Sequence, residues 1–115
     1  MRIAISITAG GTEGKVSGRF GRCPFFMIYD IESGEYEVIP NPATAMSGGA
    51  GSKAAEIIIE KDCEAIISGN IGPNAYRALK AANVKMYTAQ DGSNIEETIE
   101  KFKNGELEEF GMNEF

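Results

Sequence analysis

Histidine and tryptophan are absent from this chain of 115 residues, and cysteine occurs only twice, as Cys23 and Cys63. Without histidine, the sequence lacks the commonest general base, the commonest transition-metal ligand and any serine–histidine or cysteine–histidine nucleophile pair. The expected first strand, residues 2–8, has none of the acidic residues that a two-metal nuclease site requires. We therefore expect a protein that binds a ligand and is not an enzyme by itself.

Long apolar runs and cationic side chains are also scarce. No stretch approaches the length of a membrane span, and residues 1–7 form a short alternating strand instead of a signal peptide. The chain has 11 Lys and Arg against 17 Asp and Glu, and this net charge of −6 argues against a groove for nucleic-acid phosphates. With no secretion signal and no CxxC pair, reduced thiols are expected, although a disulfide stays open. The prediction is a cytoplasmic protein without a nucleic-acid or membrane partner.

The chain does have an alternation of strands and helices that predicts a single α/β domain. Strands are expected at residues 2–8, 25–32, 36–39, 64–68 and 84–88, and helices at about 52–61, 73–82 and 94–103. Ser33-Gly34 between two extended runs predicts an antiparallel hairpin, so one strand should oppose the rest. The later strand–helix units imply right-handed crossovers. We predict a five-stranded mixed, mainly parallel sheet with flanking helices.

Helix-end signals set the expected boundaries. Asn83 should end the second helix by adopting the left-handed backbone conformation, and Asn104-Gly105 should end the last helix. Ser93, with Glu96 three residues later, predicts a capping box at the start of that helix. The acidic residues 106–115 are interpreted as a solvated end of the chain and not as a docking peptide.

The predicted topology places a binding site at one edge of the sheet. The loops that leave the carboxyl ends of the parallel strands are residues 9–24, 41–51, 69–73 and 89–93, and they hold nearly all the glycine outside the tail and the hairpin turn. Ligands of open α/β sheets bind at this edge. Three helix N-termini point to it, which suits an anion.

Arg19, Arg22 and Cys23 form the most distinctive cluster at this edge. A guanidinium binds oxyanions with two parallel hydrogen bonds, and a nearby cation favours the thiolate that binds iron and other soft metals. The equally weighted alternative is two solvated arginines and a cysteine that packs as a small hydrophobe.

Two glycine turns complete the candidate site. Gly48, Gly49 and Gly51 allow a ligand to approach the backbone, although their spacing matches neither a Walker nor a dinucleotide motif. The turn Gly72-Pro73-Asn74 forms either an anion nest at a helix start or a plain tight turn. For Cys63, packing is the favoured interpretation.

Several segments together resemble a known family. They are Met1-Arg2-Ile3-Ala4-Ile5, Val16-Ser17-x-x-Phe20-Gly21-Arg22, Ile71-Gly72-Pro73-Asn74-Ala75 and Asn104-Gly105-Glu106-Leu107. Over about residues 1–107 the chain resembles the dinitrogenase iron–molybdenum cofactor biosynthesis family, the NifX-like domains that also occur at the C-terminus of NifB. The loop and the Gly72 turn in combination make this resemblance fairly specific.

The resemblance implies a ribonuclease-H-like core at 1–107, followed by an acidic tail at 108–115. It also implies a cytoplasmic, non-catalytic carrier of an iron–sulfur or iron–molybdenum-type cluster, with cluster-assembly or nitrogenase-type proteins as partners. The expected cofactor-binding residues are Arg19, Phe20, Gly21, Arg22, Cys23, Gly48, Gly49, Gly72 and Asn74, and Cys23 is the expected metal ligand.

One position departs from the family pattern. Many relatives have histidine just before Phe-Gly-Arg, where this chain has Arg19. Binding would then use Cys23 as a ligand, or would rest on arginines and backbone N–H groups alone. Two other functions stay open: a metal-free adaptor that regulates a cluster-assembly enzyme or ATPase, and a binder of a phosphate or nucleotide. Because the family also occurs in organisms without nitrogenase, no nitrogenase role follows.

Overall fold

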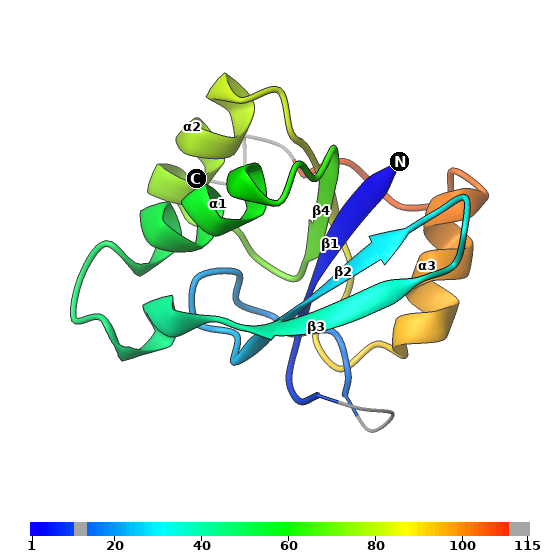
Figure 1. Ribbon diagram of the computed structural model, residues 1–115, viewed down its shortest axis with the longest axis horizontal. Helices are drawn as coiled ribbons and strands as arrows, with labels where there is room; N and C mark the ends of the chain where they lie inside the picture. The colour runs from blue at the N-terminus through cyan, green and yellow to red at the C-terminus, as the bar shows by residue number, and fades with distance from the viewer. Residues whose placement is uncertain (11–13, 111–115) are drawn as a thin grey trace.

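The computed structural model describes residues 1–10 and 14–110 (Figure 1). Within these residues, five strands and three α-helices follow one another in the predicted order. They are β1 (Arg2–Ile7), β2 (Phe25–Asp30), β3 (Tyr36–Pro40), the 3₁₀ turn η2 (Pro42–Ala45), α1 (Ala50–Glu60), β4 (Ala65–Ser68), α2 (Pro73–Ala81), β5 (Lys85–Thr88) and α3 (Ile95–Lys103). The predicted boundaries are right to within about two residues. The long loop predicted at 9–24 includes residues 11–13, which lie outside the described residues.

The five strands form one sheet in the order β3-β2-β1-β4-β5. β1 pairs in parallel with β4, and β4 with β5, whereas β2 is antiparallel to both β1 and β3. β2 is therefore the strand that opposes the rest, which confirms the predicted mixed sheet and is consistent with a ribonuclease-H-like core. The carboxyl ends of β1, β4 and β5 consequently share one edge.

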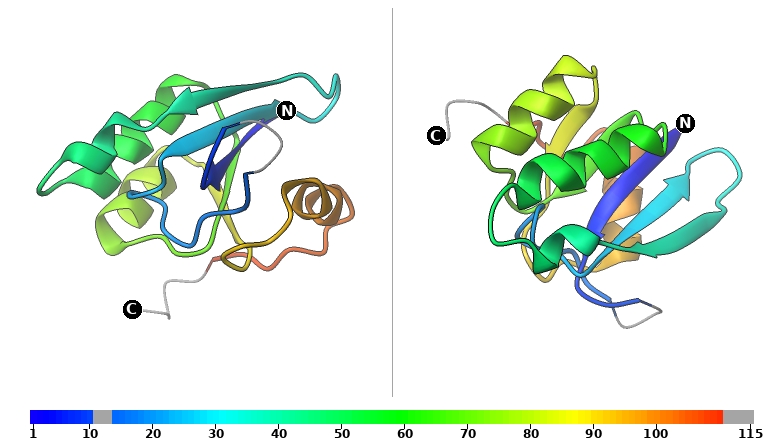
Figure 2. Two further views of the ribbon diagram at one scale, coloured as in Figure 1. Left: turned by 90° about the horizontal axis from the view of Figure 1, so that it is seen from below. Right: turned by 60° about the vertical axis from the view of Figure 1, so that its left-hand side comes forward.

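Helices cover both faces of the sheet, as Figure 2 shows, with α1 and α2 on one face and α3 on the other. Because side chains alternate along a strand, β1 contributes Ala4 to the core under α1 and α2. Its neighbours Ile3, Ile5 and Ile7 pack on the opposite face, with Ile99 of α3. Burial on both faces explains why β1 is apolar apart from Arg2 and Ser6.

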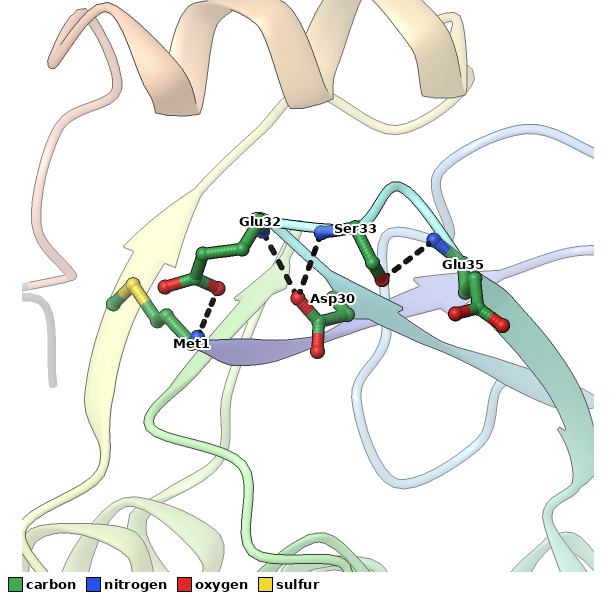
Figure 3. Close-up of polar contacts among 5 residues, drawn as sticks. All are labelled: Met1, Asp30, Glu32, Ser33 and Glu35. Carbon is green, nitrogen blue, oxygen red and sulfur yellow. Dashed lines mark hydrogen bonds and ion pairs between the residues drawn. The ribbon is translucent and has the colours of Figure 1, made fainter.

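The turn of the β2–β3 hairpin lies at the opposite end of the sheet, beside the start of β1 (Figure 3). The Asp30 carboxylate accepts hydrogen bonds from the N–H groups of Glu32 (2.9 Å) and Ser33 (3.2 Å). These backbone donors, Ser33 first, lower the pKa of Asp30. The amino group of Met1 pairs with the Glu32 carboxylate, which raises the pKa of that amino group. With Gly34 at φ +77°, the turn takes the predicted hairpin form.

The predicted capping box of α3 is wrong by one residue. The N-cap is Asn94, whose Oδ1 accepts the Glu97 N–H at 3.0 Å. The Ser93 hydroxyl instead donates to the carbonyl of Gln90 at 2.6 Å, because Ser93 belongs to the preceding turn. The stop at Asn83 is confirmed, with φ +62°.

The segment predicted from Glu106 as a solvated end is docked on β5 in the part that the structure describes, although Glu106, Glu108 and Glu109 are exposed as predicted. The N–H of Thr88 donates to the Glu108 carbonyl, and the N–H of Phe110 donates to the Met86 carbonyl, each at 2.8 Å. Phe110 is buried, and its ring lies 6.0 Å from that of Tyr76. Residues 111–115 of the predicted tail lie outside the described residues.

Among the described residues, no helix is long and apolar enough to cross a membrane.

Candidate functional site

A shallow cavity of about 320 Å³ opens beside the carboxyl ends of β1 and β4. Three segments form it: the loop before β2, the start of α1, and the turn between β4 and α2. Its lining residues are Arg19, Phe20, Gly21, Arg22, Gly49, Ala50, Gly51, Asn70, Gly72, Pro73, Asn74 and Ala75. We call this the arginine cavity. It lies at the edge where the topology predicts a ligand.

Two helices begin at this cavity without a cap of their own. The N-cap residues Gly49 of α1 and Gly72 of α2 provide no side-chain hydrogen bond, and neither first turn contains an acidic residue. The first N–H groups of a helix have no partner within the helix and carry partial positive charge. Of these, the N–H groups of Ala50 and Asn74 have no partner among the backbone hydrogen bonds of the described residues and suit an anion.

Close backbone contacts hold the three segments together. A Cβ atom on Gly21 would lie 3.0 Å from both N and Cα of Gly51, and a Cβ on Gly51 would lie 3.3 Å from the Cβ of Ala75. The Phe20 N–H donates to the carbonyl of Asn70 at 2.9 Å. Glycine is thus needed at position 21 because the loop and the helix start approach so closely.

The arginine cavity is cationic although the chain is acidic. Arg22 donates through Nη1 to the carbonyls of Thr44 (3.3 Å) and Met46 (2.7 Å), which tethers the loop to the segment before α1. Among the described residues, neither Arg19 nor Arg22 forms an ion pair with a carboxylate. Both arginines are exposed, and no acidic residue lines the cavity. The positive charge is left uncompensated where the helix N-termini converge.

Cys23 lies beneath this cavity and not in its lining. The residue is 1% exposed, and its Sγ donates to the carbonyl of Phe20 at 3.2 Å. Asn41, itself buried, donates to the Cys23 carbonyl at 2.9 Å. Burial raises the pKa of the thiol to about 11, opposed by the side chains of Ser6 and Asn41. In this arrangement Cys23 is a neutral thiol within the core.

The structure thus gathers most, but not all, of the residues predicted from the sequence. Seven line the arginine cavity: Arg19, Phe20, Gly21, Arg22, Gly49, Gly72 and Asn74. Gly48 lies nearby in the chain, and a Cβ there would meet nothing within 4 Å. Cys23 is the other residue outside the lining. Within the described residues, no group of three His, Cys, Asp or Glu side chains is arranged to hold a metal ion.

Sequence reasoning missed two contributors. Asn70 lines the cavity and accepts the Phe20 N–H through its carbonyl. Asn41 fixes the loop from below, through hydrogen bonds from its amide to the carbonyls of Gly21 and Cys23. Cys63 is buried, as predicted. Lys53 lies outside the cavity lining, with its Nζ 3.6 Å from the Glu56 carboxylate on the exposed side of α1.

Comparison with known proteins assigns the family. The family model described as dinitrogenase iron-molybdenum cofactor matches residues 1–105. An uncharacterized protein of Methanocaldococcus jannaschii is 40% identical over 113 residues, which cover 96% of this chain and 92% of that protein. The apo form of the orange protein from Desulfovibrio gigas superposes with a TM-score of 0.90 at 29% identity, over 96% of this chain and 92% of that one. A Thermotoga protein with a provisional NifB assignment gives 0.81 at 41% identity, over 94% and 91%. The chain therefore belongs to the dinitrogenase iron-molybdenum cofactor family.

Proposed function

We propose that this protein is a non-catalytic carrier that binds an anionic iron–sulfur or iron–molybdenum-type cluster in the arginine cavity during metallocofactor assembly. One observation carries the proposal: two helix N-termini without caps and two arginines without carboxylate partners converge on a cavity that has no acidic lining residue. Such an arrangement stabilises a bound anion. When the cavity is empty, its positive charges lie close together.

Each proposed residue has a role in holding the cargo. Arg19 and Arg22 would donate from their guanidinium groups to the outer atoms of the cluster. Gly48, Gly49 and Gly72 would let it approach the backbone, where the first N–H groups of α1 and α2 donate.

Phe20, Gly21 and Asn74 would set the shape of the site. Cys23 is a soft ligand near the cavity, and its burial means that it could coordinate a metal only after the loop above it moves.

Family membership supports the choice of cargo. The family description names the iron-molybdenum cofactor, and the orange protein was solved in its apo form, which implies a ligand-bearing counterpart. We therefore propose cluster-assembly or nitrogenase-type proteins as the partners that supply and receive the cargo, in the cytoplasm. The buried thiol and the absence of histidine from the chain fit binding better than turnover.

Anaerobic reconstitution with iron, sulfide and molybdate tests the proposal. We expect a coloured species with stoichiometric metal, which is lost at high salt because the contact is electrostatic. Arg19→Ala should weaken it, whereas Lys85→Ala, which removes an equal charge at the opposite edge, should not. A protein that stays colourless and metal-free would contradict the proposal and favour the metal-free adaptor.

A further inference from the structure

Arg77 of α2 is a third arginine beside the arginine cavity, although it does not line that cavity. Its Nη2 donates to Oδ1 of Asn74 at 3.3 Å, and Asn74 is one of the lining residues. Residues three apart on a helix are neighbours on its surface, and helical side chains lean toward the helix N-terminus. The Arg77 guanidinium therefore lies over the first turn of α2, next to the wall of the cavity.

No carboxylate neutralises this third arginine. Arg77 is exposed and forms no ion pair with any residue that the structure describes. Lys53, in the first turn of α1, differs, because the Glu56 carboxylate lies 3.6 Å from its Nζ. Arg19, Arg22 and Arg77 thus leave three uncompensated positive charges around the two uncapped helix starts.

The position of the Arg77 guanidinium is unfavourable for the helix alone. The N-terminal end of a helix carries partial positive charge, so a cation there is repelled, whereas a cation in the last turn is stabilised. α3 follows this rule, with acidic residues in its first turn and lysines in its last. α2 has no acidic residue in its first turn and holds a guanidinium over it. A multiply charged anion bound at this point would turn the repulsion into attraction.

We propose that Arg77 is a binding residue for the cargo, that Asn74 positions it, and that the site is therefore matched to an anion with several negative charges. This inference rests on the proposed carrier function and goes further by naming the charge class of the cargo. A singly charged anion would leave most of the cationic charge unbalanced. A metal–sulfide cluster or a polyphosphate chain, which share a high negative charge, would balance it.

Two inorganic probes of different charge test this match. Binding of tripolyphosphate and of orthophosphate is measured by calorimetry at the same pH and ionic strength. We expect the wild type to bind tripolyphosphate about 30-fold more tightly, and Arg77→Ala to reduce this preference about tenfold, because a charge-assisted contact is lost. Wild-type protein with no preference for the more highly charged probe would overturn the proposal.

Two further variants separate a contact by Arg77 from an effect of net charge. Lys80→Ala removes an equal charge from the last turn of the same helix, where the Lys80 Nζ lies 5.6 Å from the centre of the Tyr76 ring. This variant should keep the full preference for tripolyphosphate. Arg77→Lys keeps the charge and should retain most of the preference. Equal losses in Arg77→Ala and Lys80→Ala would overturn the proposed contact.

Asn74→Ala tests the positioning role, because it removes the side-chain oxygen that holds Arg77 and keeps the backbone N–H. We expect it to weaken tripolyphosphate binding when Arg77 is present and to have no further effect when Arg77 is already alanine. Urea unfolding checks that the variants remain folded, as expected for two exposed residues. The same loss from Asn74→Ala in both backgrounds would show that Asn74 contacts the anion itself, and would overturn the positioning role.

These results separate the inference from the carrier function. Wild-type protein that prefers tripolyphosphate through Arg77 but takes up no cluster would contradict the carrier function and leave a site for a phosphate or nucleotide. Cluster uptake that is equally strong in the wild type and in Arg77→Ala would overturn the third arginine and leave the arginine cavity as the site.

Discussion

The helix starts on the two faces of the sheet differ in how their N–H groups are satisfied. α3 begins with Asn94 as a side-chain cap and carries Glu96 and Glu97 in its first turn. α1 and α2 begin at glycine, without a cap and without an acidic residue in the first turn. The α3 terminus is thus neutralised by its own sequence, whereas the first N–H groups of the other two have no side-chain cap. This difference, with two uncapped starts beside two arginines, is what supports the proposed anion site.

The same division appears in the two cavities along the carboxyl edge. The arginine cavity has no acidic lining residue, whereas a second cavity of about 840 Å³, between α3 and the C-terminal segment, is lined by four glutamates and one lysine: Glu97, Lys101, Glu106, Glu108 and Glu109. Opposite potentials therefore lie along one edge. An anion is attracted to the half formed by α1 and α2 and repelled from the half formed by α3.

Reversing the charge of the arginine cavity should have the largest effect. Arg19→Glu replaces an unpaired cation by an anion at the site, and we expect binding of the reconstituted cluster to weaken at least 100-fold, about 2.7 kcal/mol. Metal analysis after gel filtration measures the loss. Lys85→Glu makes the same charge change at the far edge and should retain binding, so equal losses in both variants would argue for net charge and against a site.

Filling the tightest backbone contact should destabilise the fold of the site. A Cβ on Gly69 would lie 2.4 Å from the Cα of Gly18, so Gly69→Ala must displace the docked loop. We expect the free energy of unfolding to fall by about 2 kcal/mol, measured by urea denaturation. The control is at Gly48, where a Cβ would meet nothing within 4 Å. Gly92 is unsuitable as a control because its φ of +86° would strain an alanine. Gly48→Ala should therefore be close to neutral.

Giving α2 the kind of cap that α3 has should remove the difference between them. Gly72→Asp places a carboxylate at an N-cap with extended backbone (φ −69°, ψ 167°), where a Cβ meets nothing within 4 Å. We expect about 0.3 kcal/mol of added stability, since glycine is itself a fair N-cap residue, and about tenfold weaker cluster binding, since 1.4 kcal/mol corresponds to a factor of ten. Gly72→Ala is the control without charge. A capped variant that bound as tightly as the wild type would show that the α2 terminus does not face the cargo.

Removing the cap of α3 is the reciprocal change, and its expected effect is the smallest of the four. Asn94→Ala deletes the acceptor for the Glu97 N–H, which should lower stability by about 1 kcal/mol. Thermal unfolding measures this change. Cluster binding should stay unaltered, and a parallel loss of binding would indicate that α3 also contributes to the site.

The sheet and its binding edge could be predicted because local signals determine them. Ser33-Gly34 indicates the hairpin that makes β2 antiparallel, and strand–helix alternation makes the remainder parallel. The cap of α3 was predicted one residue early because Ser93 and Asn94 are both good cap residues. Contacts elsewhere decide between them, since the Ser93 carbonyl accepts the Val16 N–H and its hydroxyl closes the preceding turn.

The features that could not be predicted depend on contacts distant in the chain. Phe110 is buried because its segment pairs with β5, which a run of glutamates before it does not suggest. Cys23 points into the core because the loop is fixed by Asn41 and Phe20, so a cysteine beside two arginines is no thiolate here.

Amide NMR of the ¹⁵N-labelled protein during addition of the cluster tests the central claim most directly. The account predicts shifted or paramagnetically broadened signals for the first-turn amides of α1 and α2, with Gly51 and Asn74 among them, and an unchanged Glu97 amide in the capped first turn of α3. Changes centred on α3, or spread evenly over the protein, would contradict the claim that the uncapped helix starts form the binding site.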